Sequence, residues 1–235
     1  MKIECVWEHN GDDTLLYASN FIGAFTRGPS LEIATQKMPC EIQSYLKWKG
    51  ESIPDVVEVE IVQQHNSELS ICDADSDVLF DEERKALSIS EYLALKSLAL
   101  KSAQSFLTLY KAIPDKNKSC LHARTTFYGQ IPRTALEMYE HTKNVNSYYF
   151  GEIGVSTGNE GSILKCREGG FAFLESQPHF LDSKVYSGSY GEEWSIRKVL
   201  RRFIWHDRIH AKAMYRMAVN TFGAAAIPNV FFFDV

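Results

Sequence analysis

The first eighty residues carry the hydrophobic pattern of a small unit that mixes strands with one helix. Apolar and polar residues alternate over 2–8, the period of a half-buried strand, and the turn-forming residues 9–13 lead into a second apolar run over 14–18. This segment predicts a β-hairpin. Apolar positions then recur at helical spacing between an N-cap at Ser30 and a stop at Gly50, which predicts one amphipathic helix.

Two further strands are expected to complete this unit. Apolar residues alternate with glutamates over 57–61, and a short apolar run covers 69–72. We therefore expect the unit to end near residue 75.

An acidic stretch over 73–83 follows, and its beginning resembles a calcium-binding loop. The EF-hand pattern requires glycine at its sixth position and glutamate at its twelfth, where this chain has Val78 and Arg84. The stretch is therefore expected to be a solvated linker.

After the linker, the hydrophobic period changes to that of helices. Ser88 and Glu91 form a capping-box pattern. Pro132 suits the first turn of a helix and Ser195 is a typical N-cap, whereas Gly169-Gly170 interrupts the third helical segment. The predicted helices cover 89–113, 132–153, 163–176 and 196–221.

Together these patterns predict an α+β protein of two domains. A small ferredoxin-like α+β domain is expected over 1–80, with the acidic linker at its end, and an all-α four-helix bundle over 81–235. The length of 235 residues and the hydrophobic content of 45% suit such a globular protein.

The charge is distributed unevenly between the two predicted domains. Residues 1–80 contain 5 basic and 14 acidic side chains, and residues 81–235 contain 20 basic and 16 acidic ones, for an overall net charge of −5. An acidic N-terminal part is a poor surface for binding phosphate groups, so nucleic acid is not the favoured partner.

The five cysteines are widely spread and form no C-x-x-C pair, so we expect reduced thiols. The chain starts without the pattern of a secretory signal, and no apolar stretch approaches the length of a membrane span. A cytoplasmic protein that does not insert into membranes is the expectation.

The last predicted helix carries the most informative residues, the pair His206 and His210. At about 100° per residue, Ile196, Val199 and Phe203 fall on the same stripe as the two histidines. The pair is thus expected to point into the core, about 6 Å apart along the helix axis, which suits two ligands of one metal ion. The basic residues Arg197, Lys198, Arg201, Arg202 and Lys212 fall mostly off this stripe.

A third ligand is available on the second helix of the predicted bundle. His141 lies at the edge of that helix's apolar stripe, on the same side as Glu137 and Tyr148. If the two helices pack together, His141 completes a three-imidazole site with an open coordination position, as in catalytic zinc sites. The alternative is that these histidines are ordinary core residues.

The order His206-Asp207-x-x-His210 also approximates the H-E-x-x-H motif of zinc proteases. Asp207 replaces the longer glutamate that acts there as general base, and no third ligand of that family's kind follows, so a protease is disfavoured. Walker, G-x-G-x-x-G and G-x-S-x-G motifs do not occur in the sequence.

The helical part resembles the DinB-like superfamily of metal-binding four-helix bundles. The resemblance rests on the segment Pro132 to Val145 and the segment Trp194 to His210, and it covers about 85–221. In that superfamily, one histidine of the second helix and an H-x-x-x-H pair of the last helix bind a divalent metal. The resemblance therefore implies His141, His206 and His210 as ligands.

Characterised members of this superfamily include enzymes that use a low-molecular-weight thiol to join or isomerise small electrophiles. The resemblance implies similar chemistry here, because metal coordination lowers the pKa of a thiol. Glu137 would orient an imidazole or accept the thiol proton, or it is a solvated helix carboxylate paired with a base. Tyr148 would hydrogen-bond a substrate, or it only packs against its neighbours.

The N-terminal part resembles the HicB-like antitoxin fold. The resemblance rests on the layout of 1–72 and on the Gly28-Pro29-Ser30 turn before the helix. It implies a basic protein partner, which suits the net charge of −9 in residues 1–80. Fused to a metal-binding bundle, this unit is instead expected to serve in dimerisation or substrate gating.

Two hypotheses follow. The first is a metal-dependent enzyme that acts on a small molecule by thiol-dependent transfer or hydrolysis, with zinc or nickel as the expected metal and a homodimer as the expected assembly. The alternative is a non-catalytic module whose N-terminal domain recognises a protein partner.

Overall fold

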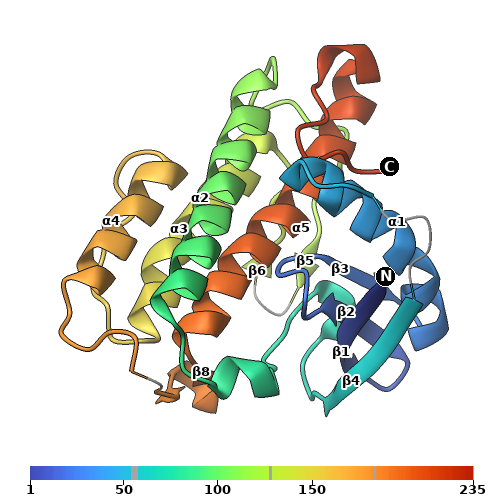
Figure 1. Ribbon diagram of the computed structural model, residues 1–235. Helices are drawn as coiled ribbons and strands as arrows, with labels where there is room; N and C mark the ends of the chain where they lie inside the picture. Colours follow the sequence, from blue (N-terminus) through green and yellow to red (C-terminus); the bar gives the residue numbers. More distant parts are fainter. Residues whose placement is uncertain (54–57, 127–128, 183, 235) are drawn as a thin grey trace.

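A computed structural model of the chain describes residues 1–53, 58–126, 129–182 and 184–234. A four-stranded sheet with one long helix forms the N-terminal part, and four further long helices follow (Figure 1). The expected mixed α+β class is therefore confirmed.

The sheet has the strand order β3-β2-β1-β4. The predicted hairpin is present as the antiparallel pair β1 and β2, whereas β4 runs parallel to β1. Helix α1 spans Leu31–Lys49, and the side chain of Ser30 accepts a hydrogen bond from the backbone N–H of Ile33, as expected of an N-cap. The strands are β1 (Lys2–Asn10), β2 (Asp13–Ala18), β3 (Phe25–Gly28) and β4 (Glu58–Asn66).

Three expectations for this unit were wrong. The run 69–72 is not a strand but leads into a single 3-10 turn, η1 (Ile71–Asp73). The short edge strand β3 was not predicted, because four residues are too few to show an alternating pattern. The resulting order of three strands, a helix and a strand differs from the β-α-β-β-α-β order of a ferredoxin-like domain. Val57, part of one predicted strand, lies outside the described residues.

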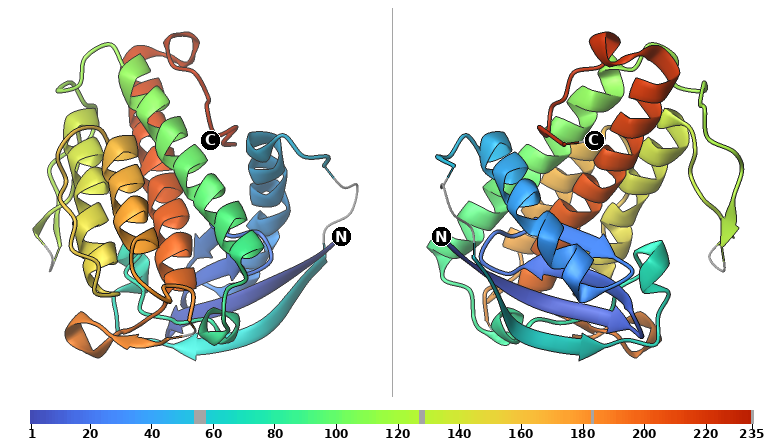
Figure 2. Two further views of the ribbon diagram at one scale, coloured as in Figure 1. Left: turned by 60° about the vertical axis from the view of Figure 1, so that its left-hand side comes forward. Right: turned by 90° about the vertical axis from the view of Figure 1, so that its right-hand side faces the viewer.

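Both faces of the sheet are covered. Ile3, Cys5 and Leu16 belong to the same buried cluster as the inner face of α1. On the opposite face, Val6, Leu15 and Tyr17 pack with Val78, Phe80 and Trp205. Strand β2 is consequently buried on both sides. Helix α1 lies on one face of the sheet (Figure 2), and it also contacts α2 and α5 directly through Trp48 and Glu41.

The acidic stretch 73–83 is not a solvated linker. Val78 and Phe80 are buried against the sheet, and Glu83 is only 4% exposed. The backbone N–H groups of Asp77 and Val78 donate hydrogen bonds to the carboxylate of Glu8, which is itself fully buried. Its acidic residues suggested solvation, but Glu83 accepts from the backbone N–H of Phe80 and pairs with Arg201 inside the protein. A second 3-10 turn, η2 (Asp81–Arg84), ends the stretch.

Four helices follow, close to their predicted positions. The capping box of Ser88 and Glu91 begins the first of them, and Ser195 caps the last. The second begins three residues later than Pro132, because Thr134 is its N-cap. The helices are α2 (Ile89–Ala112), α3 (Ala135–Gly151), α4 (Ile163–Glu175) and α5 (Ile196–Phe222).

Helix α4 continues through Gly169-Gly170, contrary to the expected interruption. A Cβ atom at residue 170 would collide with the ring of Phe150 on α3. Glycine at this position therefore permits the close approach of α3 and α4 rather than breaking the helix.

The four helices pack side by side, with α2 and α3 each in contact with both α4 and α5 (Figures 1 and 2). Short elements fill the connections between them. These are β5 (Thr125–Thr126), β6 (Gly129–Gln130), β7 (Tyr186–Ser187), η3 (Ser189–Gly191), β8 (Glu193–Trp194) and, after α5, η4 (Ala224–Ala226).

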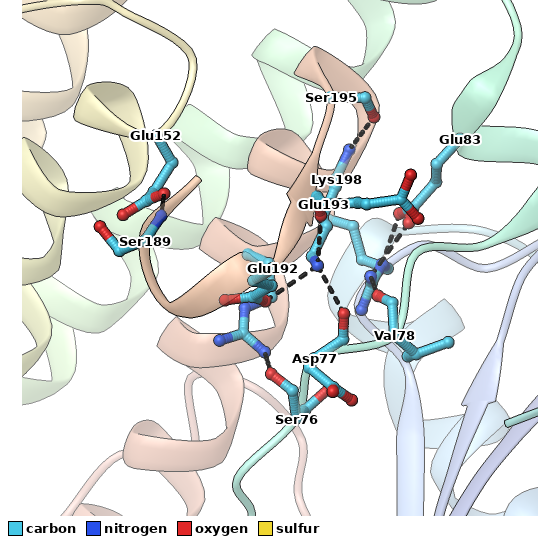
Figure 3. Close-up of polar contacts among 12 residues, drawn as sticks. Ser76, Asp77, Val78, Glu83, Glu152, Ser189, Glu192, Glu193, Ser195 and Lys198 are labelled. Carbon is cyan, nitrogen blue, oxygen red and sulfur yellow. Dashed lines mark hydrogen bonds and ion pairs between the residues drawn. The ribbon is translucent and has the colours of Figure 1, made fainter. Parts of the chain in front are cut away.

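Helix α5 is buried on both of its sides, which the sequence pattern did not predict. Lys198, Arg201 and Arg202, expected on a polar face, are buried because the sheet and the acidic stretch cover that face. Lys198 donates to the backbone oxygens of Asp77 and Glu193, at 2.7 Å each (Figure 3).

Arg201 makes the tightest of these contacts. Its guanidinium pairs with Glu83 at 2.5 Å and also donates to the carbonyl of Val78 at 2.9 Å. The same group lies over the ring of Phe80, with its central carbon 3.8 Å from the ring centroid. The two parts of the chain also share a hydrophobic core. One cluster of buried residues runs from the sheet through α5 into the other helices.

All five cysteines lie in the described part of the chain, and none of them forms a disulfide there. Among the described helices, none combines the length and the apolar character that a membrane crossing requires.

We predict that Arg201→Met lowers the free energy of unfolding by about 3–5 kcal/mol, because Glu83 would remain buried without its partner. Urea unfolding followed by circular dichroism measures the change. The control is Lys85→Met, which removes an exposed ion pair with Glu82 and should leave stability nearly unchanged. Equal effects of the two variants would show that the acidic stretch is not docked on α5.

A second prediction concerns the turn between β2 and β3. Gly23 has a φ of +95°, and a Cβ there would collide with the side chain of Ile204 on α5. Gly23→Ala should therefore destabilise the protein by about 1–3 kcal/mol more than Gly50→Ala, which meets the same backbone restriction but open space. Equal losses in urea unfolding would contradict the contact between this turn and α5.

Candidate metal centre

Three histidines from two helices meet at one point of the helical part. His206 and His210 lie on successive turns of α5, and His141 faces them from α3. One ring nitrogen of each lies within 4.8 Å of the other two. The ring centroids are 4.4 to 5.2 Å apart. The structure thus brings together the three residues that the sequence pointed to.

The three imidazoles differ in their access to solvent. His206 is 7% exposed, His210 is partly buried, and His141 is exposed at the outer edge of the group. The site is therefore closed on the core side and open beside α3, which leaves room for a ligand from solvent.

Burial keeps the imidazoles neutral. Partial desolvation of the ring of His141, whose outer edge remains exposed, lowers its pKa, and burial together with the neighbouring His141 lowers the pKa of His210 to about 3. The pKa of His206 is also well below its ordinary value, first through burial and then through the charges of His210 and His141. Neutral imidazole is the form that binds metal ions.

The residues present fit a divalent transition metal. Among the described residues, the buried Nδ1 atom of His206 has no hydrogen-bond partner, which is a cost that a metal ion or an outer hydrogen bond would remove. Two nitrogens bound to one tetrahedral zinc ion at about 2.0–2.1 Å lie about 3.3–3.4 Å apart. The three ring nitrogens lie within 4.8 Å of one another, so binding of an ion would draw them closer together.

Aromatic and basic side chains surround His206. The ring of Tyr149 lies edge-on at a centroid distance of 5.9 Å, and the guanidinium of Arg202 lies over the Tyr149 ring at 5.4 Å. The helical phase of Arg202 predicted a place on the polar face of α5 and gave no indication of this arrangement. Its position four residues before His206 was the available signal, because residues i and i+4 are neighbours on a helix.

Asp207, the residue that stands in place of the zinc-protease base, is engaged elsewhere. Its carboxylate forms a fully buried ion pair with Arg167 of α4 at 3.2 Å. The pair joins α4 to α5, and the guanidinium of Arg167 stacks on the ring of Phe203. Asp207 therefore has a structural partner on the core side of the helix.

Glu137 lies in the first turn of α3, where its carboxylate accepts hydrogen bonds from the backbone N–H groups of Arg133 and Thr134. These two bonds lower the pKa of Glu137. The group of clustered metal-ligating side chains contains the three histidines without Glu137. The contacts of this carboxylate are those of a helix cap, and its catalytic role stays a prediction.

Tyr148 is 38% exposed, with its ring against those of Tyr149 and Trp194. Partial burial raises the pKa of its hydroxyl, so the group remains protonated at neutral pH. It can donate a hydrogen bond to a ligand, and substrate binding by Tyr148 stays a prediction.

A second group of potential ligands consists of Glu8, His65 and Asp77. Glu8 already accepts hydrogen bonds from two backbone N–H groups and from the hydroxyl of Tyr17. His65 Nε2 lies 3.0 Å from Asp77. His65 and Asp77 thus pair with each other, Glu8 is bound by Tyr17 and the backbone, and these contacts join β1 and β4 to the acidic stretch.

Comparisons of the chain with protein-family models, with curated proteins and with solved structures found no match.

We predict that Glu137→Ala lowers the free energy of unfolding by about 0.3–1.5 kcal/mol through loss of the helix cap. Glu137→Gln should lower it less, because glutamine also forms capping boxes. Urea unfolding measures both changes, and elemental analysis should show the same metal content as in the parent. A loss of metal in Glu137→Gln would assign the carboxylate to the metal centre instead.

Proposed function

We propose that this protein is a metal-dependent enzyme that acts on a small molecule through His141, His206 and His210. The observation that carries the proposal is the convergence of three neutral imidazoles from two helices. They form a group that is buried on one side and open on the other. Three protein ligands with an open position are typical of catalytic rather than structural metal sites.

The donor set limits the metal without fixing it. Three imidazole nitrogens suit zinc and nickel, and other first-row ions such as iron also accept them. The ion would supply Lewis acidity, which lowers the pKa of a thiol or a water molecule that reaches the open position.

The chain's own residues would hold and orient the reactants. The two histidines of α5 are fixed by a helix that is buried on both sides, so their geometry is rigid. Tyr148 presents a protonated hydroxyl to a ligand beside α3. We propose thiol-dependent group transfer as the reaction and hydrolysis as its alternative, with a low-molecular-weight thiol as co-substrate in the first case.

The competing proposal, a non-catalytic module that binds a basic protein, draws on the excess negative charge of the N-terminal part. Part of that charge has partners in the helical part of the chain. Glu41 pairs with Arg208, and Asp73 pairs with Arg124. The charge asymmetry is therefore accounted for in part by contacts between the two parts, which favours the enzyme.

We predict that the purified protein, prepared without a histidine tag, contains about one equivalent of a transition metal. His206→Ala/His210→Ala should contain almost none, because a single remaining imidazole binds weakly. Elemental analysis measures both. Added metal should also raise the melting temperature of the metal-free parent and not that of the double variant.

The matched control is His179→Asn. His179 is an exposed histidine with a φ of 58°, a conformation that asparagine tolerates, so this variant removes an imidazole without disturbing the fold. Its metal content should equal that of the parent. A double variant that retains the metal of the parent would refute the three-histidine site.

A further inference from the structure

A cleft of about 830 Å³ lies where the two parts of the chain meet. Its walls come from the start of β2, from β3, from α1 and from the C-terminal half of α5. The volume and the position between two structural units are typical of small-molecule sites. No residue of this cleft belongs to the group of three histidines.

The cleft nevertheless adjoins the metal centre through α5. Ile209 and Ala213 line the cleft, and they precede and follow His210 by one and three residues. At about 100° per residue, Ala213 and Ile209 lie about 60° and 100° around the helix axis from His210. The edge of the α5 wall that Ala213 forms is therefore the part of the cleft nearest to the face that carries the histidines.

Positive charge gathers on the walls of the cleft. Four basic side chains line it, two from the N-terminal part and two from α5: Arg27, Lys37, Lys212 and Arg216. Within the described part of the chain, Arg216 has no ion-pair partner and is exposed.

The acidic residues of the cleft balance this charge incompletely. Asp13, Glu41 and Asp234 also line it. Glu41 is held by Arg208, which lies outside the cleft, at 2.6 Å, and Lys212 reaches the same carboxylate only at 3.7 Å. Because one carboxylate is shared by two cations, the four basic groups of the cleft exceed the acidic groups available to them.

The cleft also offers apolar surface. Phe25, Ile71 and Ile209 contribute to its lining between the basic groups. A ligand with an apolar body and an acidic group would match both features, since pockets combine apolar walls with a few charged groups that fix orientation.

We propose that the cleft binds a small organic acid, with an apolar body and a carboxylate or phosphate group, as the substrate that is presented to the metal centre. The binding itself stands on the charge and the shape of the cleft, and its role as a substrate site rests on the proposed function. The basic residues would hold the acid group while the body of the ligand lies along α5 toward His210.

Isothermal titration calorimetry with three matched probes tests the inference. The probes are 3-phenylpropionate, phenyl phosphate and the uncharged 3-phenylpropan-1-ol. We expect saturable binding of at least one of the two acids and about tenfold weaker binding, or none, of the alcohol, a difference of the size that one ionic contact provides. The acid that binds more tightly shows whether the cleft prefers a carboxylate or a phosphate group.

Variants of Arg216 locate the binding. Arg216→Gln should weaken binding of the acid about three- to tenfold, and the charge reversal Arg216→Glu should weaken it further. The control, Lys165→Gln, removes an exposed cation from α4 and should leave the affinity unchanged. Circular dichroism verifies that each variant is folded.

The inference is overturned if neither acid binds the parent, or if Arg216→Glu binds the acid as tightly as the parent does. These outcomes are separable from those for the metal. A parent that holds metal but binds no acid refutes the cleft alone, whereas a parent that binds acid and holds no metal refutes the proposed function and leaves the anion site standing.

Discussion

Burial of helix α5 on both sides is the constraint on which the rest of the structure depends. Its apolar stripe packs against α2 and α3, while its basic residues face the sheet and the acidic stretch. A buried cation without a partner costs several kcal/mol, so each must be matched. Arg201 with Glu83, Arg208 with Glu41 and Lys198 with backbone carbonyls meet this requirement. These contacts bind the acidic stretch and helix α1 to α5, and the pair of Glu41 with Arg208 joins an acidic residue of the N-terminal part to a basic residue of the helices.

The same constraint fixes the candidate metal centre. Buried contacts on both sides of α5 position His206 and His210 opposite His141 on α3. The buried pair of Arg167 and Asp207 fixes the helix on its core side, next to the histidines. The geometry of the three imidazoles therefore depends on contacts formed by residues far from them in sequence, and the cleft beside His210 arises from the docking of the N-terminal part on the same helix.

The sequence predicted the elements that depend on local patterns. The hairpin, the capped helices and the helical phase of His206 and His210 follow from the spacing of residues within one segment. The burial of Arg201 and Glu83 as an ion pair could not be predicted, because a charged residue is usually exposed and becomes buried only when it has a partner. That partner can lie far away in the sequence. His141 was placed correctly only on the assumption that α3 packs against α5. The contacts of Glu137 at the N-terminus of α3 were readable in principle, since Thr134-x-x-Glu137 is a capping-box pattern.

The most direct test of this account is X-ray absorption spectroscopy of the metal-loaded protein at the metal edge. Three imidazole ligands predict a first coordination shell of light atoms at about 2.0–2.1 Å for zinc, with the outer-sphere scattering of histidine rings and no sulfur. A shell that contains sulfur at about 2.3 Å would place the metal on cysteine residues instead. A shell without imidazole scattering would equally contradict a centre formed by His141, His206 and His210.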